Sequence, residues 1–282
     1  MKEKVQIYIC SFASDDLKKS VIRFKNQAEE MKIYSGLRVF GFDDLSESKK
    51  TQIENFKRKK QIRLFGYACW KPEIILSYLK QIPNNAILQY SDIGCHLSPK
   101  GLSRLQEYIH LTKKNNILAF QYKKPDFGGL NYKYQIYLEK EYSKGDLFDY
   151  FGLSLNHQIA QTEQYWSGTI FFKNNEFSEK FLNKWNNVCK KDYLINDENS
   201  KINNHQDFKE HRHDQSVFSI LCKLNGITSL SASEIEWAED HIDKTWKHLK
   251  NFPILAKRDK KYNLFTRFIK RQKRNINRLL KK

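Results

Sequence analysis

The sequence lacks long apolar runs, a disulfide pattern and a recognisable leader. None of its 282 residues belongs to a stretch approaching the ~18 apolar residues that a membrane span needs. The five cysteines are widely scattered without a Cys-x-x-Cys pair, which argues against a disulfide framework or a zinc knuckle and predicts reduced thiols. The apolar segment 5–10 is too short for a signal peptide. These absences predict a cytoplasmic protein that does not cross a bilayer.

Acidic residues are few relative to basic ones, and the imbalance is uneven. The formal net charge is +18, and residues 257–282 carry twelve Lys or Arg against the single Asp259. Elsewhere the two signs are interspersed, as on an ordinary solvated surface. With 40% hydrophobic and 14% aromatic residues, the chain can bury a sizeable core. We therefore expect one domain, large enough for an enzyme, over residues 1–256 and a basic amphipathic tail over residues 257–282.

Strand and helix signals alternate through most of the chain, without an internal repeat. Helical periodicity appears in the segments 17–31, the fifties, 70–82, 102–111, 177–189 and 214–224, and strand-like runs occur at 5–10, 37–42, 86–90, 117–121 and 169–172. Such alternation predicts an α/β fold with a mainly parallel sheet. The segment 122–145 has little periodicity and is expected to be an excursion facing the substrate.

Two polar clusters are candidates for a site. Asp92 lies in the loop 91–95 that directly follows an apolar strand, and ligands of open α/β sheets bind at such strand ends. The other cluster is His213-Asp214-Gln215. A carboxylate suits Mg2+ or Mn2+, and Mn2+ also accepts a histidine nitrogen. A simpler interpretation also explains both aspartates, with Asp92 in a turn and Asp214 as a helix cap.

The context of these clusters resembles the nucleotide-sugar glycosyltransferases with the GT-A fold. Tyr90-Ser91-Asp92-Ile93-Gly94 resembles their metal-binding Tyr-x-Asp-x-Asp loop. The segment 166–172, Trp-Ser-Gly-Thr-Ile-Phe-Phe, resembles their Asn-Ser-Gly-hydrophobic strand, and Asp214-Gln215 their late Asp-Gln motif. Within this fold, the sequence resembles the bacterial lipopolysaccharide and capsule sugar transferases, through Gly-Tyr-x-x-Trp-Lys-Pro at 66–72, Tyr-x-Asp-x-Gly at 90–94 and His-Arg-His-Asp-Gln-Ser at 211–216.

The resemblance implies a GT-A fold, with a mostly parallel mixed sheet flanked by helices, and transfer of a hexose from UDP-galactose or UDP-glucose to a surface glycan. The partners would be the nucleotide sugar, a glycan or glycolipid acceptor and the inner face of the cell membrane. The implied catalytic residues are Asp92, Asp214 and Gln215; the donor-binding residues are Tyr90, Lys71, Trp70, Ser167, Gly168 and Arg63; and the metal ligands are Asp92 and His213.

One departure from the family pattern concerns the metal, Mn2+ or Mg2+. Gly94 stands where these loops usually have a second carboxylate, so coordination by the loop depends on Asp92. His213 or Asp214 could compensate, or Lys71 and Arg63 could neutralise the diphosphate. In either case a positive charge is needed, because departure of a nucleoside diphosphate builds negative charge on the β-phosphate.

The sequence leaves the stereochemistry open, together with the donor sugar, acceptor, linkage and oligomeric state. An inverting enzyme needs a base at the acceptor hydroxyl, for which Asp214, His213 and Asp146 are candidates. If the enzyme is retaining, Asp214 instead binds donor hydroxyls.

Other features have competing interpretations. Trp70 and Trp166 could stack on a base or sugar, or belong to the core; Cys95 is expected to be a structural thiol, and His241 and His248 surface residues. The tail suits an anionic membrane surface, but could also pack on the domain or bind nucleic acid. The alternative functions are a non-catalytic basic module binding nucleic acid or membrane and, less favoured, a metal-dependent hydrolase using His211, His213 and Asp214.

Overall fold

The structure is a computed structural model of the chain that describes residues 5–59, 63–125, 136–236, 249–257 and 272. Of the expected tail it describes Lys257 and Gln272 alone; the remainder of the tail, like His241 and His248, lies outside the described residues. Among the helices it describes, none is long and apolar enough to cross a membrane.

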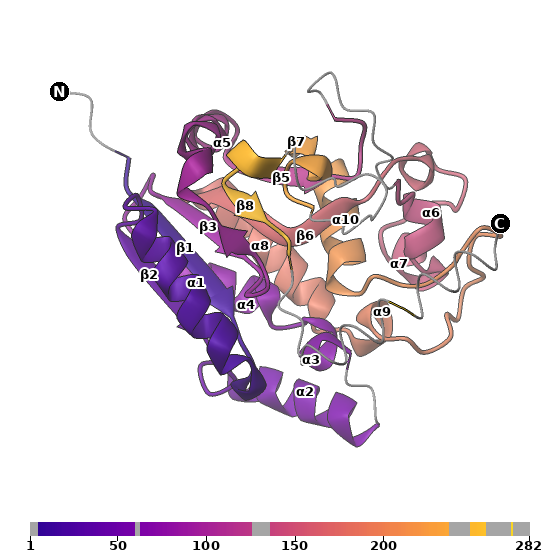
Figure 1. The fold of residues 1–282 in the computed structure, drawn as a ribbon. Coiled ribbons are helices and arrows are strands. Elements are labelled where there is room, and N and C mark those ends of the chain that lie inside the picture. Colours follow the sequence, from indigo (N-terminus) through magenta and orange to yellow (C-terminus); the bar gives the residue numbers. More distant parts are fainter. Residues whose placement is uncertain (1–4, 60–62, 126–135, 237–248, 258–271, 273–282) are drawn as a thin grey trace.

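A six-stranded mixed sheet forms the centre of the molecule (Figure 1). Its spatial order is β2 (Gly36–Phe40), β1 (Ile7–Phe12), β3 (Ile87–Ser91), β6 (Tyr165–Lys173), β5 (Ile117–Gln121) and β7 (Thr228–Ser231). β6 runs antiparallel to its neighbours β3 and β5, while the β1–β2, β1–β3 and β5–β7 pairs are parallel. The expected α/β fold with a mostly parallel mixed sheet is confirmed.

Helices cover both faces of this sheet. One face carries α2 (Glu47–Arg58), α4 (Lys71–Leu79), α8 (Glu176–Cys189) and α10 (Asp214–Leu224), whose apolar residues share one core cluster. The other face carries α1 (Lys18–Glu30) and α5 (Leu102–Asn115), with a second cluster. Alternate residues of each strand serve the two clusters, as the period of two in a strand requires: Leu118 and Phe120 face one, Ile117 and Ala119 the other.

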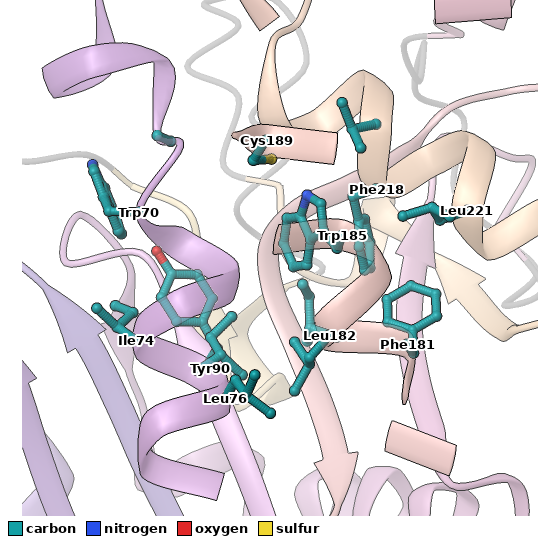
Figure 2. Close-up of a cluster of buried hydrophobic side chains, with 14 of the residues drawn as sticks. Trp70, Ile74, Leu76, Tyr90, Phe181, Leu182, Trp185, Cys189, Phe218 and Leu221 are labelled. Atoms are coloured by element: carbon teal, nitrogen blue, oxygen red, sulfur yellow. The ribbon is translucent and has the colours of Figure 1, made fainter. Parts of the chain in front are cut away.

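The larger cluster brings together segments that are distant in sequence (Figure 2). Trp185 of α8 is fully buried and lies 4.8 Å, centroid to centroid, from Phe218 of α10. Side chains of α4, including Ile74 and Leu76, complete this layer. The packing fixes the starts of α4 and α10, where several of the polar residues singled out above are located.

The smaller elements lie around this frame. They are β4 (His96–Leu97), which pairs antiparallel with β8 (Ile254–Leu255), the short helices α3 (Leu64–Tyr67), α6 (Glu139–Tyr142), α7 (Gly145–Tyr150) and α9 (Asp192–Ile195), and the 3-10 turns η1 (Asp15–Leu17), η2 (Pro99–Gly101), η3 (Gln158–Gln161) and η4 (Ala232–Glu234). Two of the short helices, α6 and α7, fall in or next to the segment 122–145 that showed little periodicity.

Some expected boundaries differ from those observed. The helix expected over residues 17–31 begins at Lys18, because Leu17 belongs to the preceding 3-10 turn η1. β6 starts at Tyr165, four residues earlier than predicted, since its first residues continue the pairing with β5. Asp214 is the first residue of α10 rather than its cap, and its carboxylate is engaged by Lys71 and Ser167 instead.

Candidate active site

Four segments meet at the carboxyl end of β3. The antiparallel pairing of Ser91 with Thr169 places Asp92, just past β3, beside the first residues of β6, and the Asp92 N–H donates to the Gly168 carbonyl at 2.8 Å. The first residues of α4 and α10, Lys71 and Asp214, reach the same point. The sheet order therefore assembles residues that the sequence keeps far apart.

Lys71 is at the centre of this arrangement. Its Nζ lies 2.9 Å from Asp214 Oδ2, 3.4 Å from Asp92 Oδ1 and 3.2 Å from Ser167 Oγ. The Lys71 side chain is only 5% exposed. Burial disfavours its charge, but the two carboxylates outweigh this effect and raise the pKa of Lys71. The structure thus holds a buried ammonium between two aspartates.

The two aspartates have different surroundings. Asp214 is buried and accepts a hydrogen bond from Ser167 Oγ at 2.9 Å; its burial raises the pKa of the carboxyl group, against the opposing effect of Lys71. Asp92 is 43% exposed and accepts a 2.6 Å hydrogen bond from the Tyr90 hydroxyl. Burial, reinforced by the Asp92 charge, raises the pKa of Tyr90, which keeps it a donor. Asp92 is therefore oriented but open to a ligand.

A cavity of about 520 Å³ lies over this group. Most of the residues singled out in the sequence line it: Asp92, Asp214, Gln215, His213, Lys71, Trp70, Ser167 and Arg63. Tyr90 and Gly168 are not among the lining residues; Tyr90 is fully buried and reaches the cavity through Asp92, and Gly168 lies beneath Trp166, which lines the wall. The structure adds lining residues that the motifs did not indicate, including Phe12, Ser14, Asp16, Leu17 and Phe65.

An aromatic wall borders the cavity beside α4. Trp70 stacks on Phe12, with ring centroids 3.8 Å apart and planes 22° apart, and its Nε1 donates to the Phe65 carbonyl at 3.2 Å. Trp70 is only 6% exposed yet lines the cavity. Trp70 therefore packs in the core, as one of the two interpretations predicted, and it also lines the cavity.

A left-handed turn delivers Trp70 and Lys71 to the site. Residues 64–68, which include α3, all have positive φ, between 50° and 82°, although only Gly66 is a glycine. The Tyr67 N–H donates to the Arg63 carbonyl and that of Ala68 to Leu64, so the turn is hydrogen-bonded like a helix of the opposite hand. Each non-glycine residue in this conformation costs about 1–2 kcal/mol. Such strain is often stored at ligand sites, and here Leu64, Phe65 and Ala68 all line the cavity.

His213 is held in a strained backbone conformation directly before α10, with φ 55° and ψ −125°. Its Nδ1 lies 2.8 Å from the Ile195 carbonyl, which accepts only, so Nδ1 carries the proton and Nε2 presents a lone pair. Nε2 has no hydrogen-bond partner among the described residues, and Asp197 Oδ1 is 3.7 Å away. Burial lowers the pKa of His213 to about 4, which keeps the ring neutral.

The described residues do not build a metal site by themselves. No group of three or more His, Cys, Asp or Glu side chains in the described parts of the chain could hold a metal ion. Asp92 Oδ1 already accepts from Tyr90 and faces Lys71, and the carboxylate beside His213 is that of Asp197. Asp92 thus offers one uncommitted oxygen as a hard ligand. The positive charge next to Asp92 and Asp214 is the Lys71 ammonium.

Other candidate residues fall outside the centre. Arg63 is half-exposed at the edge of the cavity, where it pairs with Asp197 at 3.4 Å and Glu210 at 3.7 Å. Asp146 does not line the cavity; it accepts hydrogen bonds from the backbone N–H groups of Lys201 and Ile202 and so anchors a loop, which argues against its role as a base.

Two further candidates are accounted for by packing. His211, one of the residues of the hydrolase alternative, also does not line the cavity and binds the Leu194 carbonyl. Cys95, like the other four cysteines, is a buried free thiol, as expected.

No family model and no curated protein matches the sequence. Among solved structures, similarity is found to a glycosyltransferase involved in glycosylation of the major capsid of PBCV-1, with 10% identity, 89% of this chain and 91% of the other covered, and a TM-score of 0.48. The galactosyltransferase LgtC, in complex with donor and acceptor sugar analogues, is 13% identical over 88% of this chain and 86% of its own, with a TM-score of 0.41. Mouse xyloside xylosyltransferase 1 is 7% identical over 89% and 97%, with a TM-score of 0.44.

Proposed function

We propose that the protein is a glycosyltransferase of the GT-A fold that transfers a hexose from a nucleotide sugar, UDP-galactose or UDP-glucose, to a surface-glycan acceptor such as lipopolysaccharide or capsule. The observation that carries this proposal is the group Lys71, Asp92 and Asp214 at the base of a 520 Å³ cavity, at the carboxyl end of a sheet strand. These three residues belong to three different motifs among those by which the sequence resembles sugar transferases, at 66–72, 90–94 and 211–216.

In the proposed reaction, the donor diphosphate lies against Lys71 and Asp92. The buried ammonium of Lys71 stabilises the negative charge that develops on the leaving diphosphate, and its fixed position means that little reorganisation is needed. Because its single positive charge is shared by Asp92 and Asp214, Lys71 also reduces the repulsion that a diphosphate would meet from these carboxylates. Arg63, at the edge of the cavity, adds a second positive charge.

A divalent cation bound by Asp92 and the donor phosphates would supply further positive charge, and His213 would contribute a ligand through Nε2, which has no hydrogen-bond partner among the described residues. Asp214 and Gln215 are proposed to hold donor hydroxyls, because both line the cavity and neither is available as a solvated base. Trp70 and Phe12 are proposed to supply apolar contact to the base or sugar, and Ser167 to form the floor beneath the donor, with Gly168 packed behind it under Trp166.

The basic tail 257–282 is proposed to hold the enzyme on the anionic inner face of the cell membrane, where a lipid-linked acceptor is found. Deletion of residues 258–282 should then abolish sedimentation with vesicles containing anionic lipid, while transfer to a soluble acceptor continues. If the full-length protein does not bind vesicles and the deletion instead removes binding to nucleic acid, the tail is a nucleic-acid-binding segment.

The proposal is tested by slow donor hydrolysis and thermal shift with UDP-, GDP-, CMP- and dTDP-sugars, each with Mn2+, Mg2+ or EDTA. One nucleotide class should stabilise the wild type and be hydrolysed. Asp92→Asn should abolish turnover without loss of folding, whereas Asp149→Asn, at an exposed position of α7, should behave like the wild type. Activity that survives EDTA would remove the metal from the proposal and leave Lys71 as the cation. A wild type that neither binds nor hydrolyses any of these sugars would overturn the transferase proposal and favour a non-catalytic binding module.

A further inference from the structure

A row of buried polar side chains lies behind the cavity wall at Gln215. Gln215 Nε2 lies 3.0 Å from Gln164 Oε1, and Gln164 Nε2 lies 2.9 Å from Glu139 Oε1. Glu139 and Gln164 are fully buried, and Gln215 is 9% exposed where it lines the cavity. The three residues come from the first turn of α6, the residue before β6 and the first turn of α10, so the row joins three elements at the site.

The partners fix the direction of each hydrogen bond. The Glu139 carboxylate and the Tyr142 carbonyl oxygen, 3.3 Å from Gln164 Nε2, are acceptors only. Gln164 must therefore direct its NH2 group toward them, which turns its Oε1 toward Gln215. Gln215 must in turn donate from its own NH2 group. Its Oε1 is then left for the cavity, and no described residue donates a hydrogen bond to it.

Glu139 is itself held in place at the inner end of the row. The Ser143 and Ser219 hydroxyls each donate to it at 2.5 Å, and the Lys223 ammonium pairs with Oε2. A buried carboxylate needs such compensation, because an unpaired one is strongly destabilising. With these donors in place, Glu139 has little freedom to move, and it serves as a fixed acceptor for Gln164.

We propose that Gln164 and Glu139 are positioning residues that hold Gln215 with its carbonyl oxygen toward the ligand. This inference rests on the proposed function. A fixed acceptor at this point favours a group that carries a proton, such as a sugar hydroxyl, and disfavours a bare phosphate oxygen. Gln215 thus contributes to the specificity for the sugar part of the donor, whereas Lys71 contributes to binding of its charged part.

The kinetic test is a double-mutant cycle with the donor that the wild type hydrolyses. Gln164→Met, which keeps the approximate volume but removes the side-chain hydrogen bonds of Gln164, among them those to Gln215 and Glu139, should lower kcat/KM about tenfold, a typical cost of misplacing one ligand contact. In a Gln215→Met background the same change should have no further effect on kcat/KM, because the side chain that it orients is gone. Equal losses in both backgrounds, or no loss in either, would overturn the proposal.

Two additional variants separate positioning from general structural damage. Gln52→Met removes another buried glutamine, whose Nε2 donates to the Cys189 carbonyl and the Asp192 carboxylate away from the cavity, and should lower thermal stability without changing kcat or KM. The exchange Glu139→Gln with Gln164→Glu keeps the net charge and supplies Gln215 with an acceptor again. This exchange should restore at least part of the activity lost in Gln164→Met.

A measurement without any donor distinguishes failure of this inference from failure of the proposed function. In 15N-labelled protein, the side-chain NH2 group of Gln215 should exchange slowly with solvent and become rapidly exchanging in Gln164→Met, with assignment from Gln215→Met. Rapid exchange of Gln215 in the wild type would overturn the inference even if the enzyme is active. If Gln215 exchanges slowly in a wild type that hydrolyses no nucleotide sugar, the row of hydrogen bonds is supported and the proposed transferase function is rejected.

Discussion

Lys71 and Asp214 form a buried ion pair across the start of two helices, with Nζ and Oδ2 2.9 Å apart. Asp92 and Ser167 share the same ammonium. The pair is an organising contact of the site as well as a charge source, because α4 and α10 must both be correctly placed before it can form.

Replacing one partner of this pair should lower the free energy of unfolding by more than expected from replacing both partners together. Lys71→Met leaves Asp214 as a buried carboxylate with Ser167 as its remaining donor, and we expect a loss of about 3 kcal/mol in the free energy of unfolding. Lys71→Met with Asp214→Leu should lose less than the sum of the two single changes. Urea denaturation of the four proteins gives the coupling energy, and additive losses would contradict a direct pair.

Tyr90→Phe should test the orientation of the Asp92 carboxylate while Asp92 itself is kept. The change removes the 2.6 Å hydrogen bond to Asp92 but keeps the buried ring, so we expect about 1 kcal/mol or less of lost stability. Donor hydrolysis should fall about tenfold, since the freed carboxylate samples other rotamers. Steady-state kinetics and urea denaturation measure the two effects; a purely structural Tyr90 would show the stability loss alone.

Gly168→Ala should displace Trp166 from the cavity wall. A Cβ at Gly168 would overlap the Trp166 indole, so the ring must turn away. We expect altered tryptophan fluorescence and a loss of donor-induced thermal stabilisation. Gly41→Ala is the matched control, because the nearest atom to its added methyl group would be Asp44 Oδ2 at 3.9 Å. An unchanged spectrum and full donor response in Gly168→Ala would show that the indole does not shape the wall.

The buried histidines should make stability fall in mild acid. Burial lowers the pKa of His211 well below 6.5 and that of His213 to about 4, so the unfolded chain binds protons that the folded protein excludes. Their contribution is fully present above pH 6.5 and is lost as the pH falls from 6.5 toward 4, by up to about 1.4 kcal/mol per pH unit for each histidine. His211→Gln should flatten the pH dependence of urea unfolding in that range. An identical slope in both proteins would contradict the shifted pKa of His211.

The sequence allowed prediction of the α/β fold and of much of the cavity lining because both depend on local patterns. Apolar runs placed the main strands and helices, and the short motifs around Asp92 and Asp214 fell at the ends of such elements. The left-handed turn at 64–68 could not be predicted, since only Gly66 favours positive φ and tertiary packing imposes it on its neighbours. Glu139 was equally hidden, because its partners are separated from it in sequence and its own segment has no regular periodicity.

The place of β6 between β3 and β5 has a consequence for synthesis of the chain. Until the ribosome has released residues 165–173, β3 has no neighbour on one side and exposes the edge of a strand that is fully buried in the finished protein. Open apolar strand edges favour pairing with other chains. During synthesis, Lys71 and Asp92 are therefore present before the sheet and the cavity can form. Aggregation of the nascent chain is avoided only if β6 is translated and paired soon afterwards.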